Sequence, residues 1–383
     1  MRILSRQAVP FLLFAPVACG NGVPAQERSP QPEAGMPAAA WQSVARPIHL
    51  GATRTVLLIA DGAGIAHWTA LHVAGDSLAV AAFPSVALVD PGNTTGLRVE
   101  SASTATAYAI GERTIHGGIG VSADLEPRPT VLEVAERHGR ATGLVTTTFL
   151  LDATPAAFAA HVPNRRDWPE IARQMLDQGI EVLMGDGLEW FDSLPIRERY
   201  RVVTDPAELE GLDTDTLPRL LGLFPIDSVA DPARRRPSLA EMTRTALEIL
   251  DRDPDGFFLL VENEHTDHRA HDNAPLSVIQ AEMRAFDEAV RVALDYRAHR
   301  PETLIVVTGD HETGGLAVVP GPDERPRGRY VLKGHSLELV PLFAVGPGSE
   351  RLTGILSNAA VGQALLARAG GEEPGDGDPS GAD

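Results

Sequence analysis

The densest group of metal-binding residue types lies in the segment Glu262-Asn-Glu-His-Thr-Asp-His-Arg-Ala-His271. Asp267 and His271 are four residues apart, so on a helix their side chains share one face and can hold one metal ion. Glu262 comes earlier, at the end of an apolar run, and can serve a second ion. Taken alone, the segment is equally compatible with a solvated loop and helix start, because Asp-x-x-x-His is a common spacing.

Two other apolar runs also end in residues that can bind metal. Residues 55–60 are followed by Asp61, and residues 303–308 are followed, after one glycine, by Asp310 and His311. Each has an ordinary explanation, since Asp forms turns and caps helices. In an open α/β sheet, however, active sites lie beyond the carboxyl ends of the strands. This shared position favours a metal centre more strongly than any single residue does.

A run of small residues, Glu100-Ser-Ala-Ser-Thr-Ala-Thr-Ala107, is expected to begin a helix with Ser101 at or near the N-cap. Free backbone N–H groups and the helix dipole at that end favour a bound phosphate. A serine nucleophile needs activation, and the chain contains no Gly-x-Ser-x-Gly segment. A metal would therefore have to lower the pKa of the hydroxyl. In isolation, a simple capping serine is the better explanation.

The elements that must position these residues alternate between strand and helix patterns. Continuous apolar runs, typical of strands buried on both faces, occupy residues 55–60, 141–146, 181–184, 256–261 and 303–308. Helical patterns occupy 129–138 and 238–250, the second with Ser238 and Glu241 in capping-box spacing. We therefore predict the α/β class: a three-layer α/β/α sandwich with a central, mostly parallel sheet.

Residues 187–237 interrupt this alternation with several Pro and Asp residues, and we expect a small irregular insert or cap over the sheet edge. Arg234, Arg235 and Arg236, at its end, are expected to form a solvated turn. The remaining histidines are expected to be structural or to lie on the surface: His67, His72, His116, His138, His161, His265 and His299.

The ends of the chain predict export. Arg2 and Arg6 precede an apolar run that is too short to span a bilayer, and Cys19 follows it. We expect residues 1–19 to be a signal peptide, of the lipoprotein type by the position of Cys19, although ordinary cleavage nearby is the alternative. Residues 20–46 read as a flexible linker, 47–369 as the catalytic domain and 370–383 as a disordered acidic tail. The expected location is periplasmic or extracellular, with the lipid anchor at Cys19.

The net charge of −19 argues against nucleic acid as the main partner, since no basic stripe is present. An anionic substrate would need strong local positive charge, which bound metal can supply.

Seven segments, in order and spanning about residues 55–347, together resemble the alkaline phosphatase family. They are Leu57–Gly64, Ser101–Ala107, Asp152–Ala157, His161–Arg165, Val261–His271, Val307–Gly315, and His335 with the Val340-Pro341 and Gly346-Pro-Gly348 that follow it.

The resemblance implies hydrolysis of phosphate monoesters through a phosphoserine on Ser101, with Arg165 binding the phosphate. It implies two Zn²⁺ ions and one Mg²⁺ ion, and small phosphorylated molecules as substrates; a homodimer is left open. The implied ligands are Asp267, His271 and His335 for one zinc, Asp61, Asp310 and His311 for the other, and Asp61, Thr154 and Glu262 for magnesium.

The chain departs from the family pattern at Glu100, where the family usually has Asp. That carboxylate steadies the phosphate-binding Arg in the family, so one extra methylene puts the position of Arg165 in doubt. His268 stands where relatives have Lys or His, and near Asp152 it is expected to tune the magnesium site.

Four other functions compete with this prediction. A phosphodiesterase or a metabolite-specific phosphatase of the same superfamily would differ in the cap, which is uninformative at the level of sequence. A sulfatase would need a Cys/Ser-x-Pro-x-Arg segment near Ser101, which is absent. A non-catalytic lipoprotein that binds metal or phosphate would be expected to lack the nucleophile or a ligand, and the chain retains them all.

Overall fold

A computed structural model describes residues 54–191 and 193–370. The predicted signal peptide, Cys19, the predicted linker and nearly all of the predicted tail lie outside these residues. In the described part, no helix has both the length and the apolar character that spanning a membrane requires.

Ten strands form one sheet in the order β12-β2-β11-β8-β1-β7-β3-β4-β6-β5. Neighbouring strands are parallel except where β11 pairs with β2 and β8. The strands are β1 (Arg54–Ala60), β2 (Ser85–Asp90), β3 (Ala141–Phe149), β4 (Val182–Asp186), β5 (Arg201–Val203), β6 (Leu220–Leu223), β7 (Phe257–Asn263), β8 (Leu304–Thr308), β11 (Val340–Val345) and β12 (Gly354–Ser357).

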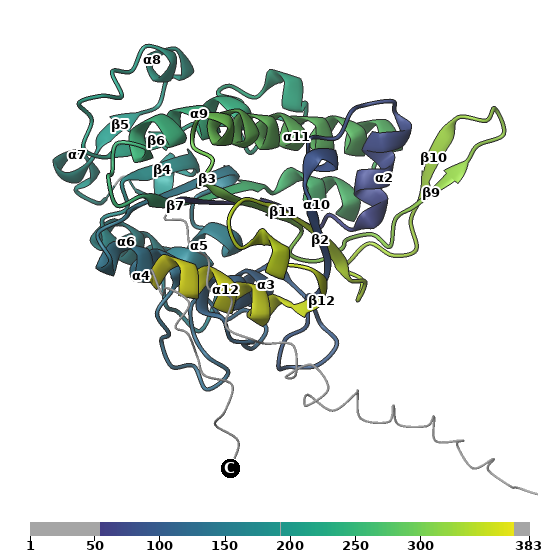
Figure 1. Ribbon diagram of the computed structural model, residues 1–383, viewed down its shortest axis with the longest axis horizontal. Coiled ribbons are helices and arrows are strands. Elements are labelled where there is room, and N and C mark those ends of the chain that lie inside the picture. The colour runs from purple at the N-terminus through teal and green to yellow at the C-terminus, as the bar shows by residue number, and fades with distance from the viewer. Residues whose placement is uncertain (1–53, 192, 371–383) are drawn as a thin grey trace, which may run out of the picture. The chain divides into compact units, whose positions relative to one another are not determined.

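Helices cover both faces of this sheet (Figure 1). They are α2 (Ile65–Val73), α3 (Ser101–Ile110), α4 (Val131–Arg137), α5 (Ala153–Ala159), α6 (Trp168–Gln178), α7 (Ile196–Arg199), α8 (Pro206–Glu210), α9 (Leu239–Leu250), α10 (His265–His271), α11 (Leu276–His299) and α12 (Asn358–Gly370). Single 3₁₀ turns lie at Ala79–Ala82, Leu188–Trp190, Pro232–Arg234 and Ser349–Arg351, and β9 (Ala317–Pro320) pairs with β10 (Pro326–Arg329) in a separate hairpin.

Alternate residues of β1 point into two separate hydrophobic cores. Leu57 and Ile59 pack with residues of α3, α4, α5, α6 and α12. Val56 and Leu58 pack with residues of α2, α9 and α11 on the other face. Because side chains alternate across a strand, a central strand with helices on both sides must be apolar throughout. The predicted three-layer α/β/α sandwich is confirmed.

The predicted capping box of α9 is also present. Ser238 Oγ accepts a hydrogen bond from the N–H of Glu241 at 3.2 Å, and Glu241 Oε2 accepts one from the N–H of Ser238 at 2.7 Å. Two of the N–H groups at this helix end are therefore satisfied by side chains.

The insert at residues 187–237 is more regular than its composition indicated. It contributes β6 and β5, which extend the sheet beyond β4 as its last two strands. These strands have four and three residues, too few for a period-two pattern to stand out beside the surrounding Pro and Asp.

The expected solvated turn at the three arginines is wrong for Arg235. Its guanidinium is buried and donates to both carboxylate oxygens of Glu282 at 2.7 and 2.8 Å. A planar guanidinium matches a carboxylate in this two-bond geometry, which makes burial of both charges tolerable. Arg234 and Arg236 are exposed, as expected.

Candidate active site

The sheet order places three ligand-bearing strand ends side by side. β1 lies between β8 and β7, with Ile59 paired to Thr308 on one side and to Glu262 on the other. Asp61 directly follows β1, Asp310 follows β8 after one glycine, and Glu262 is the last but one residue of β7. All three carboxylates are fully buried. The structure therefore gathers at one edge the residues that the strand pattern singled out.

Asp267, His271 and His335 form one group of candidate ligands. Nε2 of His271 lies 3.0 Å from Nε2 of His335 and 3.3 Å from Oδ2 of Asp267. Nδ1 of His271 faces the carbonyl of Lys333, and Nδ1 of His335 lies 2.7 Å from the carbonyl of Val99. Each Nδ1 therefore donates its proton to a carbonyl, and when both rings are neutral two Nε2 lone pairs face each other. A cation between them would remove this repulsion.

Asp61, Asp310 and His311 form a second group, next to Ser101. Nε2 of His311 lies 3.2 Å from Oδ2 of Asp310 and 3.6 Å from Oδ1 of Asp61. Ser101 Oγ lies 3.3 Å from the same Nε2. The ring of His311 also stacks on that of His335, with centroids 3.8 Å apart, so the two groups are contiguous.

Several polar side-chain atoms of the third group have no hydrogen-bond partner in the part of the chain that the structure describes. Both carboxylate oxygens of Asp61, Oε1 of Glu262 and the hydroxyl of Thr154 are buried without a hydrogen-bond partner in the described chain. Glu264 joins Asp61 and Glu262 in a buried cluster whose ligand atoms lie within 4.8 Å of one another. Sequence reasoning missed Glu264, although it stands in the same acidic segment two residues after Glu262.

Burial and mutual repulsion govern the ionisation of these acids. Burial raises the pKa of Glu262 to about 8 and that of Asp310 to about 6. It also raises the pKa of Asp61 and Glu264 well above their usual values, and each neighbouring carboxylate adds to the effect. Such carboxylates bind protons unless other cations neutralise them. The unpartnered oxygens and facing imidazoles show that the residues fit divalent cations.

Arg165 is held from two sides at the start of α3. Its Nη1 lies 3.0 Å from Oε2 of Glu100, and its Nη2 lies 2.8 Å from Oδ1 of Asp152. Glu100 is the N-cap of α3 and also accepts the N–H groups of Ala102 and Ser103. The longer side chain therefore still reaches the arginine. Ser101 is the first helical residue, next to the cap.

Glu100 is charged despite its burial. Burial raises the pKa of this carboxyl, but the N–H of Gly117, the Arg165 guanidinium and the N–H groups of α3 together lower it by more. Glu100 thus has two roles. It caps the helix that carries Ser101, and it is one of the two carboxylates that hold Arg165.

His268 has a different acidic neighbour from the one expected. Its Nε2 lies 3.3 Å from Oε1 of Glu264. The carboxylate of Asp152, by contrast, accepts hydrogen bonds from Arg165 and from the N–H of Ala153. The expected influence of His268 on the magnesium site stays a prediction, and Glu264 is the residue through which His268 would act.

Comparison with known proteins identifies the family. The alkaline phosphatase family model matches residues 53–195 and 185–330. The chain belongs to the alkaline phosphatase family. It is 33% identical to alkaline phosphatase 3 of Bacillus subtilis over 289 residues, which is 69% of this chain and 62% of that protein. The chain thus aligns with less than two thirds of that relative's length.

Two further relatives align over more of their own length. The streptomycin-6-phosphate phosphatase of Streptomyces griseus is 31% identical over 403 residues, which covers 81% of this chain and 89% of that protein. The alkaline phosphatase structure from the Antarctic bacterium TAB5 superposes with a TM-score of 0.77 at 27% identity, covering 84% of this chain and 99% of that one. For this member of the family, the edge formed by β8, β1 and β7 is therefore the candidate active site.

Proposed function

We propose that the protein is a metal-dependent phosphomonoesterase in which Ser101 is the nucleophile. The observation that carries the proposal is the position of Ser101 Oγ. It lies at the first turn of an α-helix, 3.3 Å from His311 Nε2 in a buried group that fits a divalent cation. The helix dipole at this end favours the charge of a phosphoryl group.

Three cations fit the candidate ligands in the proposal. Asp267, His271 and His335 would hold one Zn²⁺, and Asp61, Asp310 and His311 the other, because imidazole and carboxylate suit zinc. Carboxylate and hydroxyl ligands suit Mg²⁺, which Asp61, Thr154 and Glu262 would hold, with Glu264 beside them. Bound there, the cations would lower the pKa of the serine hydroxyl and neutralise charge on the leaving oxygen.

The protein's own residues would carry the remaining steps. Ser101 Oγ attacks phosphorus in line with the leaving oxygen, and the phosphoryl group passes to the serine. Arg165 donates two hydrogen bonds to phosphoryl oxygens, in an orientation that Glu100 and Asp152 maintain. Water then attacks the phosphoserine from the opposite side, so two inversions leave the configuration at phosphorus retained.

The test compares a monoester with a diester. We expect p-nitrophenyl phosphate to be turned over far faster than bis-p-nitrophenyl phosphate by protein loaded with zinc and magnesium. A diester has one charge fewer and a second bulky group on the phosphorus that Arg165 must hold. Faster turnover of the diester would contradict the proposal in favour of a phosphodiesterase.

One surface feature favours a metabolite-specific phosphatase as a second candidate. A hollow of about 370 Å³ is lined by Phe149, Trp168, Asp186, Gly187, Glu189, Trp190, Asp227 and Ser228. Its rings and carboxylates suit a basic leaving group, since aromatic faces and acids both attract cations. The similarity to the streptomycin-6-phosphate phosphatase agrees with this chemistry. A kcat/KM for that substrate well above the value for p-nitrophenyl phosphate would establish the second candidate.

Replacing Glu100 by Ala should raise KM for a phosphate monoester about tenfold. A hydrogen bond to a charged group contributes about 1.5–3 kcal/mol, and this one orients Arg165. We expect phosphate inhibition to weaken by a similar factor, while kcat falls less. The matched control is Glu112→Ala, because Glu112 is exposed and pairs with Arg128 instead. Unchanged KM and phosphate inhibition would show that Glu100 does not position the arginine.

We further propose that the protein is exported and anchored through lipid on Cys19. The support is the basic and apolar sequence before that residue. Replacing Cys19 by Ser should move the protein from the membrane fraction to the soluble fraction, as followed by immunoblotting. Wild-type protein already found in the soluble fraction would contradict the anchor.

A further inference from the structure

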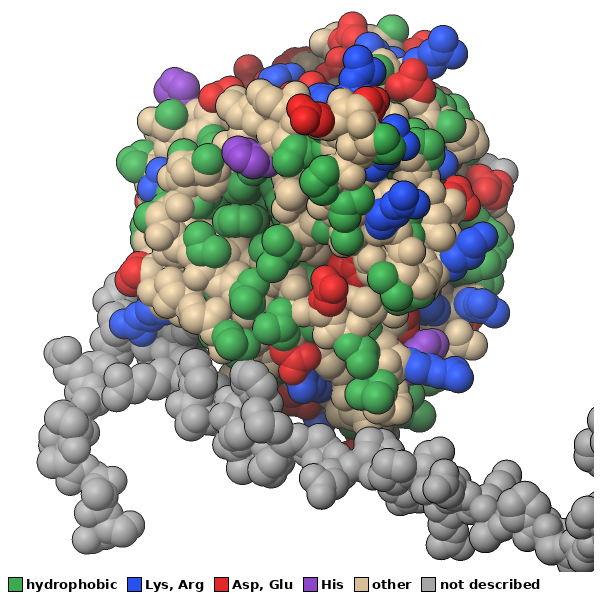
Figure 2. Space-filling model, turned by 90° about the vertical axis from the view of Figure 1, so that its right-hand side faces the viewer, with side chains coloured by type: hydrophobic (Ala, Val, Ile, Leu, Met, Phe, Trp, Pro, Cys, Tyr) green, Lys and Arg blue, Asp and Glu red, His purple; other side chains and the backbone are tan. Residues whose placement is uncertain are grey.

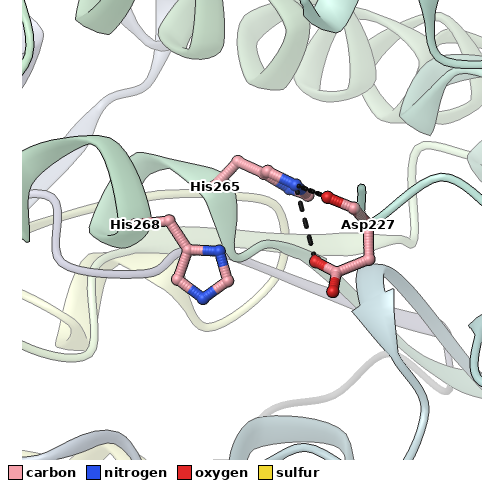
Figure 3. A group of neighbouring side chains, drawn as sticks. All are labelled: Asp227, His265 and His268. Atoms are coloured by element: carbon pink, nitrogen blue, oxygen red, sulfur yellow. Dashed lines mark hydrogen bonds and ion pairs between the residues drawn. The ribbon is translucent and has the colours of Figure 1, made fainter. Parts of the chain in front are cut away.

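Asp227, His265 and His268 form a cluster apart from the ligands assigned above. Asp227 follows β6, and both histidines belong to α10. Each residue offers one ligand atom, and the three atoms lie within 4.8 Å of one another. Figure 3 shows the ring of His268 turned toward His265 and Asp227. The sequence predicts only a structural or surface role for His265.

The hydrogen bonds of Thr147 determine where His265 carries its proton. Thr147 Oγ1 donates to Asn263 Oδ1 at 3.1 Å. The amide of Asn263 is fixed in this orientation because its nitrogen donates to the carbonyl of Glu282 at 3.1 Å. While the Thr147 hydroxyl donates to Asn263, it can only accept from Nδ1 of His265, 3.0 Å away. In that arrangement the proton of the neutral ring lies on Nδ1, and Nε2 presents a lone pair.

That lone pair faces two oxygens that are also acceptors. Nε2 of His265 lies 2.8 Å from the backbone carbonyl of Asp227 and 3.6 Å from its Oδ1. Oδ1 is buried and has no hydrogen-bond donor among the described residues. A second proton on the ring would form a hydrogen bond with one of these oxygens. A metal cation would instead bind the ring nitrogen and the carboxylate together.

The same arrangement occurs at the candidate active site. There the Nε2 atoms of His271 and His335 face each other at 3.0 Å beside Asp267. The two clusters have the same donor set of one carboxylate and two imidazoles.

His268 also has the surroundings of a metal ligand. Its Nε2 faces Oε1 of Glu264 at 3.3 Å, which leaves Nδ1 for a cation. Histidine ligands commonly donate their other ring N–H to a carboxylate, which fixes the tautomer and the ring orientation.

We propose that Asp227, His265 and His268 form a fourth cation site. One carboxylate and two imidazoles select Zn²⁺ or a similar divalent ion of the first transition series over Mg²⁺ or Ca²⁺. Water completes the coordination. The ion links the segment after β6 to α10, the helix that carries Asp267 and His271. It also lies at the wall of the hollow that Asp227 lines.

The first test counts metal. Chelated protein is reloaded with zinc chloride and magnesium chloride and desalted, and its zinc is measured by plasma mass spectrometry. We expect wild type to retain one zinc per chain more than Asp227→Asn. The amide that this substitution introduces can donate to His265 Nε2, so the variant is expected to fold without the ion. Asp215→Asn, which replaces an exposed carboxylate, is the matched control and should equal wild type.

The second test needs no variant. Wild-type crystals grown with zinc should show an anomalous peak at the zinc edge between Asp227, His265 and His268. Equal zinc content in wild type and Asp227→Asn, or no peak at this position, would overturn the proposal. Neither readout depends on turnover, so a protein without phosphatase activity could still contain the site, and an active one could lack it.

Discussion

Ser101→Ala should lower kcat for a phosphate monoester by roughly 10³-fold while metal content stays that of wild type. The substitution removes the only hydroxyl at the first turn of α3 that lies beside His311. Loss of the nucleophile leaves charge stabilisation by bound cations and Arg165 intact, so a residual rate through direct attack of water is expected.

Two neighbouring hydroxyls provide the controls for this result. Ser103 Oγ donates to the carbonyl of Glu100 at 3.1 Å, so Ser103→Ala should remain close to wild type. Thr104 Oγ1 lies 3.0 Å from the same carbonyl, as expected for a side chain that bonds back within its own helix. Trapping with substrate at acidic pH, followed by peptide mass spectrometry, should place the phosphoryl group on Ser101. A phosphoryl group on Ser103 or Thr104 instead would overturn the assignment.

Chelation should abolish activity and lower the melting temperature by about 10 °C or more. A cation present at 1,000 times its Kd contributes about 4 kcal/mol to stability, and in a domain of this size each kcal/mol shifts Tm by about 2–4 °C. Zinc plus magnesium should restore both properties. Full activity after verified removal of all metal would rule out the metal-dependent mechanism.

The chelated protein should also respond to pH in a characteristic direction. In the folded chain, burial raises the pKa of Glu262 to about 8 and that of Asp310 to about 6. An acid with a raised folded pKa is neutral in both states at low pH, and stability falls as pH rises through the folded value. Metal-free protein should therefore melt at a lower temperature at pH 8.5 than at pH 5, as calorimetry can measure. With metal bound the trend should reverse, because the carboxylates must be ionised to bind it.

Contacts of the site could be predicted from the sequence where position along a strand determines position in space. Asp61 and Asp310 each follow an apolar run, and parallel strand ends must meet at one edge, so their approach could be predicted. The capping box at Ser238 and Glu241 is similarly local, since both partners lie within one turn.

Contacts that depend on the path of a loop could not be predicted from the sequence. Arg235 binds Glu282 across 47 residues, and nothing near either residue distinguishes it from an exposed arginine. Asp227 approaches His265 only because β6 extends the sheet, and four residues are too few to reveal that strand. Glu264 could have been suspected, since it stands in the acidic segment after β7. Its burial is set by tertiary packing that sequence pattern does not encode.

The order of strands in the sheet also constrains how the protein folds. β1, the first strand, pairs with β7 and β8, so Thr55 pairs with Leu304 and Arg54 with Phe257. The middle of the sheet can therefore close only after most of the chain has emerged from the ribosome, and such distant contacts form slowly. A nascent chain that ends before Leu304 would leave unpaired the edge of β1 that β8 covers, and it would lack Asp310, His311 and His335. Catalytic competence should consequently arise in a single late step, and chaperones should engage the incomplete chain until then.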